Sequence, residues 1–100
     1  MENSVFLIPV TTPEDIKELV PDYLNNILGE MEKIKLAIEQ NDSNSIGKIT
    51  HKIRGTAKSY GFESIHKATE RLQDSADQGN FEQTLSWALE IINYIQKTQS

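Results

Sequence analysis

One hundred residues with 37% hydrophobic content can bury one modest core, so we expect a single domain over residues 1–100. Ten basic residues against fifteen acidic ones give a net charge of −5, which argues against nucleic acid as the main partner. The chain has no cysteine, which excludes a disulfide framework and a thiolate metal site and fits a reducing compartment. The apolar run over residues 5–10 is too short for a signal-peptide core or a membrane span. We therefore expect a cytoplasmic protein without membrane contact.

The first twenty residues carry weak helix signals. Residues 1–11 have no helical period and include Pro9, so we expect an extended lead-in. Thr12 is a candidate N-cap, with Pro13 at the first helical position and two acidic residues after it. These signals predict a short helix, which Pro21 breaks or kinks. Its apolar face would consist of Ile16, Leu19 and Val20.

Four longer segments have the apolar spacing of amphipathic helices. They run over about residues 21–40, 43–60, 62–78 and 81–95. Asp42 or Ser43 is expected to cap the second of them, Gly61 and Gly79 to end the second and third, and Asn80 to open a capping box for the last.

The linkers between these segments contain only a few residues, and no alternating strand pattern occurs anywhere. Short connections join helices that lie antiparallel to one another. The sequence therefore predicts an all-α fold, an antiparallel up-down-up-down four-helix bundle with a core over about residues 21–97 and a short extra N-terminal helix.

The helix over residues 43–60 carries a histidine on its polar side. Its apolar positions recur at steps of three and four: Ile46, Ile49, Ile53, Ala57 and Tyr60. At about 100° per residue, His51 lies almost opposite them, so its imidazole should point into water. Gly47 and Gly55 lie one turn before and after it. Glycine within a helix costs roughly 0.8–1 kcal/mol relative to alanine, so we infer that these two leave room for another surface to reach the imidazole.

The same helix forms a basic segment, residues 45–62, within an acidic chain. The segment has no acidic residue and four basic ones: Lys48, Lys52, Arg54 and Lys58. Its charge is therefore +4, and that of the remaining residues is −9. Such a segment favours docking to an acidic pocket, and Arg54 and Lys58 beside the histidine would stabilise a phosphoryl group on the ring. The alternative is an ordinary solvated helix face rich in lysine.

The run from His51 to Gly61 resembles the motif of the histidine-containing phosphotransfer (HPt) domain family. That motif is a His, any residue, Leu or Ile, Lys or Arg, Gly, any residue, Ala or Ser, and a Gly at the tenth position after the His. Here the positions hold His51, Ile53, Arg54, Gly55, Ala57 and Gly61. The resemblance is close from Ile46 to Leu72 and rests on helix pattern elsewhere. Three residues differ from those commonest at their positions in the family: Thr50, Lys58 and Tyr60. Lys58 and Tyr60 would affect which receiver domain, the partner of this family, the protein accepts.

The resemblance implies a phosphorelay intermediate of two-component signal transduction, a phosphocarrier without kinase activity of its own. His51 would accept a phosphoryl group from an aspartyl phosphate on a receiver domain and pass it to another receiver. A neutral imidazole nitrogen is a good nucleophile near pH 7, and phosphoryl transfer asks mainly for positioning and charge neutralisation. Arg54 would neutralise the phosphoryl oxygens, Gly55 would leave room for the receiver's loops, and Gln73 on the next helix would lie near the imidazole.

Three further site residues are expected from helix geometry. Lys58 would lie close to the phosphate, and Gly47 and Lys48 would contact the partner. The partners implied are response-regulator receiver domains or a hybrid histidine kinase, with Mg²⁺ carried by the receiver and no cofactor on this chain. We expect a monomer, and both a free-standing relay protein and a domain of a hybrid kinase fit the sequence.

Three other functions compete with this interpretation. A histidine kinase dimerisation helix pair also presents a His on a bundle, but there an acidic residue typically follows the His, whereas Lys52 follows His51. A helical adaptor that binds a signalling partner without carrying phosphate is the main alternative. For a hydrolytic enzyme, no nucleophile, base and oxyanion-stabilising group can be assembled. His66 is expected to be a residue at the core boundary, and Asp74 with Asp77 is weak support for a metal site.

Overall fold

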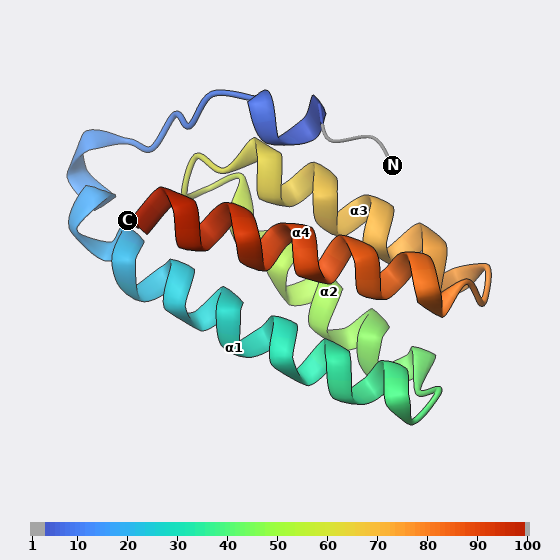
Figure 1. Ribbon diagram of the computed structural model, residues 1–100. Helices are drawn as coiled ribbons and strands as arrows, with labels where there is room; N and C mark the ends of the chain where they lie inside the picture. Colours follow the sequence, from blue (N-terminus) through green and yellow to red (C-terminus); the bar gives the residue numbers. More distant parts are fainter. Residues whose placement is uncertain (1–3, 100) are drawn as a thin grey trace.

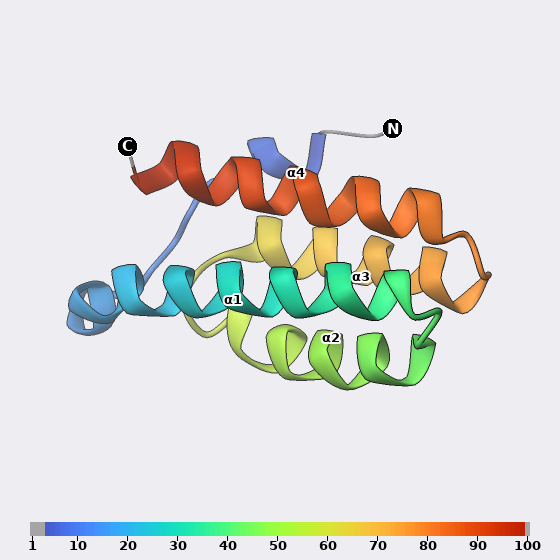
Figure 2. The same cartoon turned by 60° about the horizontal axis from the view of Figure 1, so that its bottom comes forward.

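Four long helices form an antiparallel bundle in the computed structural model, which describes residues 4–99 (Figure 1). They are α1 (Val20–Glu39), α2 (Ser43–Ala57), α3 (Glu63–Asp77) and α4 (Phe81–Gln99). Each helix packs against the next along the chain, and α4 closes the bundle against α1. Figure 2 shows α2 and α4 on opposite sides of the bundle. The predicted up-down-up-down fold is confirmed.

The starts of two helices follow the predicted capping chemistry. Asp42 is the N-cap of α2, and its side chain accepts a hydrogen bond of 3.1 Å from the backbone N–H of Ser45. The Asn80 side chain accepts one of 3.2 Å from the backbone N–H of Gln83 at the start of α4. Both bonds satisfy N–H groups that have no partner within their own helix.

The end of α2 differs from its prediction. The helix ends at Ala57 rather than near Tyr60, and residues 58–61 form a turn. That turn is closed by the backbone N–H of Phe62, which donates to the Ala57 carbonyl at 2.9 Å. Gly61 has a φ of +84°, the left-handed conformation expected for a residue that ends a helix.

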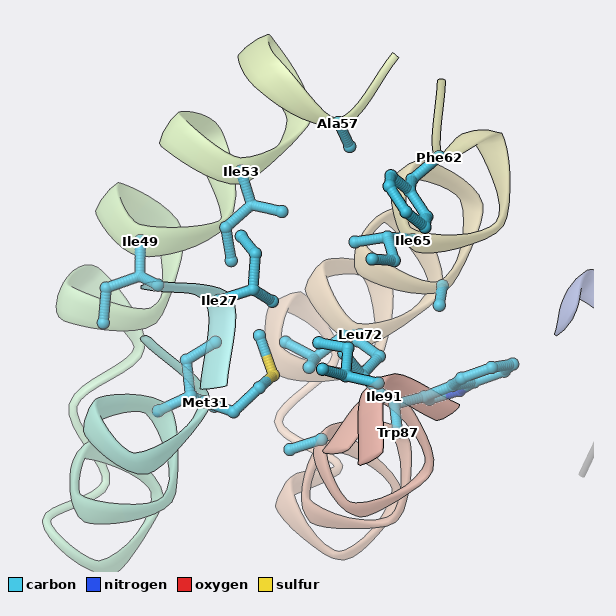
Figure 3. Packing of buried hydrophobic residues seen from close by; sticks show 14 of the residues in the cluster. Ile27, Met31, Ile49, Ile53, Ala57, Phe62, Ile65, Leu72, Trp87 and Ile91 are labelled. Atoms are coloured by element: carbon cyan, nitrogen blue, oxygen red, sulfur yellow. The ribbon is translucent and has the colours of Figure 1, made fainter. Parts of the chain in front are cut away.

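The core lies between the four helices and draws on all of them (Figure 3). Buried side chains there include Ile27 and Met31 from α1, Ile49 and Ile53 from α2, Ile65 and Leu72 from α3, and Trp87 and Ile91 from α4. Met31, Leu72 and Ile91 have no exposed surface. Because α2 is anchored by this face, its opposite face is held toward solvent in a defined orientation.

The N-terminal segment is not extended throughout, contrary to the expectation for residues 1–11. Ser4–Leu7 form a turn of 3₁₀ helix, η1, beside α3, while residues 1–3 lie outside the described range. Val5 is buried, and the Phe6 ring lies 5.2 Å from that of Tyr94 on α4. Burial of Val5 and partial burial of Phe6 explain why the segment adopts local structure despite its lack of helical period.

The predicted short helix is present as a second 3₁₀ helix, η2 (Glu14–Leu19), but its expected N-cap is wrong. Pro13, not Thr12, is the N-cap, because the Thr12 hydroxyl donates to the Tyr60 carbonyl at 2.7 Å. Of the expected apolar face, Leu19 is 51% exposed, whereas Ile16 is partly buried and Val20 packs against the core. The short helix ends at Leu19, before Pro21 as expected, and Pro21 itself lies in the first turn of α1, where proline is tolerated.

Candidate functional site

His51 lies on the exposed face of α2, opposite the core residues Ile49 and Ile53. Its imidazole forms no hydrogen bond or ion pair with any residue in the range 4–99. The ring is therefore accessible, and the helix beneath it is fixed by packing. This is the arrangement that a side chain needs in order to react with a group brought by another protein.

The two glycines near His51 have different surroundings. A Cβ atom on Gly55 would meet nothing within 4 Å, so this position is open surface as predicted. A Cβ atom on Gly47 would lie 3.8 Å from the Gln73 side-chain oxygen, an ordinary van der Waals contact. Gly47 therefore lies partly exposed beside Gln73 of α3, whereas the space around Gly55 is open.

The Gln73 side chain is held by one residue from α2 and one from α3. Its side-chain oxygen accepts a hydrogen bond from the hydroxyl of Thr50, and its amide nitrogen donates to Asp77 at 2.7 Å. Thr50 is 1% exposed and immediately precedes His51. The structure thus places Gln73 beside the helical turn that carries the histidine. Sequence reasoning missed Thr50 and Asp77 as its partners, although the four-residue spacing of Gln73 and Asp77 on one helix was a usable signal.

Arg54 extends toward α3 and faces an acidic residue there. Its Nη2 lies 3.5 Å from Oε2 of Glu70, and the two side chains are 43% and 35% exposed. The other carboxylate oxygen of Glu70 lies 3.8 Å from Nδ1 of His66 on the same helix. The His66 side chain is 14% exposed, so this second histidine lies at the boundary of the core rather than on the open surface. Glu70 was not predicted as part of the site.

The basic segment is partly compensated by acids from the neighbouring helices. Lys52 Nζ lies 3.6 Å from a carboxylate oxygen of Glu30 on α1, just as Arg54 faces α3. The sequence pattern indicates an ordinary solvated charge at Glu30, but its side chain is only 18% exposed. Lys48 and Lys58 are exposed and form no ion pair within the described part of the chain. The net positive surface near His51 is therefore smaller than the sequence suggested.

At the start of the helix, Lys48 contributes to the electrostatics of the N-cap. The pKa of the Asp42 carboxyl is lowered, mainly by hydrogen bonds from the Ser45 hydroxyl and backbone N–H, with a smaller contribution from the charge of Lys48. The acid that caps α2 is thus ionised at neutral pH and favourable at the positive end of the helix dipole.

Two aromatic rings cover the flank of α2 that faces α1. Tyr23 and Tyr60 stack with ring centroids 4.0 Å apart, and the Tyr23 hydroxyl lies 2.9 Å from that of Thr56. Burial raises the pKa of Tyr23, and the nearby Tyr60 raises it further against the opposing effect of the Thr56 hydrogen bond. Tyr60, noted above as a departure from the motif, therefore has a packing partner that the sequence pattern did not reveal.

Two other kinds of functional feature, a metal-binding cluster and a membrane-spanning helix, are absent from the described residues. Between residues 4 and 99, no three His, Cys, Asp or Glu side chains converge on a point where they could hold a metal ion. Over the same residues, every helix is too short or too polar to cross a lipid bilayer.

Comparison with known proteins gives one match. The model of the Hpt domain family matches residues 18–100, which include the four long helices and His51. Searches of curated proteins and of solved structures found no match. Because the family match covers most of the chain and agrees with the bundle and its exposed histidine, the chain belongs to the Hpt domain family, whose members have phosphotransfer roles in two-component signalling.

Proposed function

We propose that this chain is a phosphorelay intermediate that accepts a phosphoryl group on His51 from a receiver-domain aspartyl phosphate and passes it to a second receiver. The observation that carries the proposal is the accessible imidazole of His51 on a packed helix, with bare surface at Gly55 and a cation at Arg54. A receiver domain must bring its own aspartate to the imidazole, and only an unobstructed face allows this approach.

In the proposed step, the unprotonated ring nitrogen attacks the phosphorus of the aspartyl phosphate. A nitrogen–phosphorus bond forms, the bond from phosphorus to the carboxyl oxygen breaks, and the carboxylate leaves with the electron pair. The other ring nitrogen then releases its proton to solvent, and transfer to the second receiver reverses these changes. The negative charge on the phosphoryl oxygens must be balanced throughout, and we assign this role to Arg54, three residues after His51 on α2.

Other residues are assigned by their place around His51. We assign Lys58 to the phosphoryl oxygens, Gln73 to the α3 side of the imidazole, and Gly47, Lys48 and Gly55 to contact with the receiver. The contacts of Gln73 with Thr50 and Asp77 support its assignment, because they hold its side chain beside the histidine's turn. The exposure of Lys48 and Lys58 supports theirs, because both remain available to a partner.

The partners proposed are response-regulator receiver domains, free or within a hybrid histidine kinase, in the cytoplasm. The Mg²⁺ that supports the chemistry is assigned to the receiver rather than to this chain. We propose that the chain acts as a monomer, since one exposed imidazole meets one receiver at a time.

The test is phosphoryl transfer from a phosphorylated receiver domain to the purified chain. We expect acid-labile, alkali-stable label on the protein, its loss in His51→Gln and its retention in His66→Gln, the matched variant of the other histidine. Label that survives in His51→Gln and disappears in His66→Gln would refute the assignment. Receiver binding without any label on the wild-type chain would instead support the non-phosphorylated adaptor.

A further inference from the structure

Arg54 already has an acidic partner within the bundle. Its guanidinium faces Glu70 through a single contact, Nη2 to Oε2 at 3.5 Å, which is too long for a strong bidentate pair. Both side chains are partly exposed, so the pair is readily rearranged. Most of the N–H donors of Arg54 therefore remain available to another anion.

Glu70 lies where it can compete with such an anion for Arg54. It belongs to α3, which packs against α2, and its second carboxylate oxygen lies 3.8 Å from His66 Nδ1. A phosphoryl group on His51 would bring a charge of about −1.5 to −2 and would attract the same guanidinium. Glu70 and the phosphoryl group would then compete for the single cation at Arg54.

We propose that Glu70 is a positioning residue that competes with the phosphoryl group for Arg54 and so keeps the phosphohistidine reactive enough to be passed on. The inference rests on the proposed function. The resting pair directs the Arg54 guanidinium toward α3, and the arriving phosphoryl group takes over part of its charge. The cost of removing Arg54 from Glu70 lowers the stability of the phosphorylated state, which favours transfer to a second receiver.

The experiment measures the equilibrium of phosphoryl transfer from the receiver to the chain. One side of this equilibrium is the phosphorylated receiver with the unphosphorylated chain, and the other is the unphosphorylated receiver with the phosphorylated chain. We expect Glu70→Gln to shift this equilibrium toward the phosphorylated chain by about two- to five-fold, the range for a weak exposed ion pair. Glu70→Asp, which keeps the charge, should remain close to wild type. Glu82→Gln removes the same charge from exposed surface on α4, across the bundle from α2, and should leave the equilibrium unchanged.

The same substitution made in an Arg54→Ala variant shows whether Glu70 acts through Arg54. In Arg54→Ala, the additional change Glu70→Gln should alter the equilibrium little, because the competition has been removed. An equal shift in both backgrounds would mean simple repulsion by the carboxylate and would overturn the proposal. No shift with Glu70→Gln alone would overturn it as well. General loss of structure would lower phosphorylation, which is opposite to the expected sign, and the helical circular dichroism signal checks it independently.

Failure of this inference can be told apart from failure of the proposed function. If the wild-type chain takes no label, or if His51→Gln is still labelled, the phosphorelay assignment fails and the role of Glu70 fails with it. If His51 is labelled normally and the equilibrium is insensitive to Glu70, only the competition between Glu70 and the phosphoryl group is refuted.

Discussion

The two faces of α2 place residues of one short motif in opposite environments. Ile53 and Ala57 are 2% and 0% exposed and pack in the core, whereas His51, Arg54 and Gly55 face solvent. The motif thus combines two independent requirements, one for packing α2 into the bundle and one for presenting the imidazole. It follows that variants of the buried set should change stability alone, and variants of the exposed set should act mainly on transfer.

Gly55 and Gly61, the two glycines of the motif, also serve these two different requirements. Gly55 borders open space, but Gly61 has a φ of +84° and lies against the N-terminal segment, where the Thr11 backbone N–H donates to the Gly61 carbonyl at 2.9 Å. Gly61 therefore belongs with the residues that build the fold, although it lies in the same motif as the histidine.

The largest expected effect comes from the buried face. Ile53→Ala should lower the free energy of unfolding by about 2–5 kcal/mol, because it removes buried methyl groups and leaves a cavity among the four helices. Urea unfolding followed by circular dichroism measures this loss. The rate of phosphoryl transfer per folded molecule should stay at the wild-type value, and a large drop would show that the two faces are coupled.

Gly61→Ala should have the next largest effect, again on stability alone. The left-handed conformation costs a residue with a Cβ roughly 1–2 kcal/mol, and here that Cβ would lie 2.3 Å from the Thr12 backbone nitrogen. Gly79→Ala is the matched control, because Gly79 has a φ of +74° but a Cβ atom there would meet nothing within 4 Å. If thermal unfolding shows equal losses for both variants, the contact of Gly61 with the N-terminal segment contributes nothing.

Tyr23→Phe tests the flank of α2 that faces α1. Loss of the hydrogen bond to Thr56 should cost about 0.5–1.5 kcal/mol near neutral pH. The folded-state pKa of Tyr23 is raised above its unfolded value of about 10, so its contribution is complete below pH 10 and is lost as pH rises through the folded pKa. Thermal unfolding between about pH 8 and pH 11 should therefore show a weaker alkaline loss in Tyr23→Phe than in wild type. The same loss in both proteins would contradict the role of burial.

Gly55→Ala should give the smallest change in stability, and it tests whether a residue of the exposed face of α2 acts in transfer without supporting the fold. Alanine in an open helical position should raise the free energy of unfolding by roughly 0.8–1 kcal/mol. Transfer from the receiver should nevertheless slow, because a side chain now occupies the bare surface beside His51. Gly29→Ala is the control, since Gly29 is an equally open position on α1 and should give the stabilisation without slower transfer. Equal transfer rates in the two variants would remove Gly55 from the docking surface.

Much of the fold could be predicted because it depends on neighbours along the chain. The three- and four-residue spacing of Ile46, Ile49 and Ile53 determines which face of α2 is buried, and so places His51 on the other face. The Asp42 and Asn80 side chains cap their helices by accepting hydrogen bonds from backbone N–H groups three positions later, so the local sequence also predicts these caps. The errors arose where distant contacts prevail, as where Thr12 donates to Tyr60 rather than capping its own helix.

The sequence by itself therefore determined the four helices, their core faces and the exposure of His51, since each follows from local periodicity and capping. Only the tertiary structure decided the partners of the charged and polar residues around it: Arg54 with Glu70, Lys52 with Glu30, and Thr50 with Gln73. Each pair joins residues on different helices, whose contact depends on how the helices are aligned and rotated against one another. That alignment results from packing the whole core, and no short stretch of sequence specifies it.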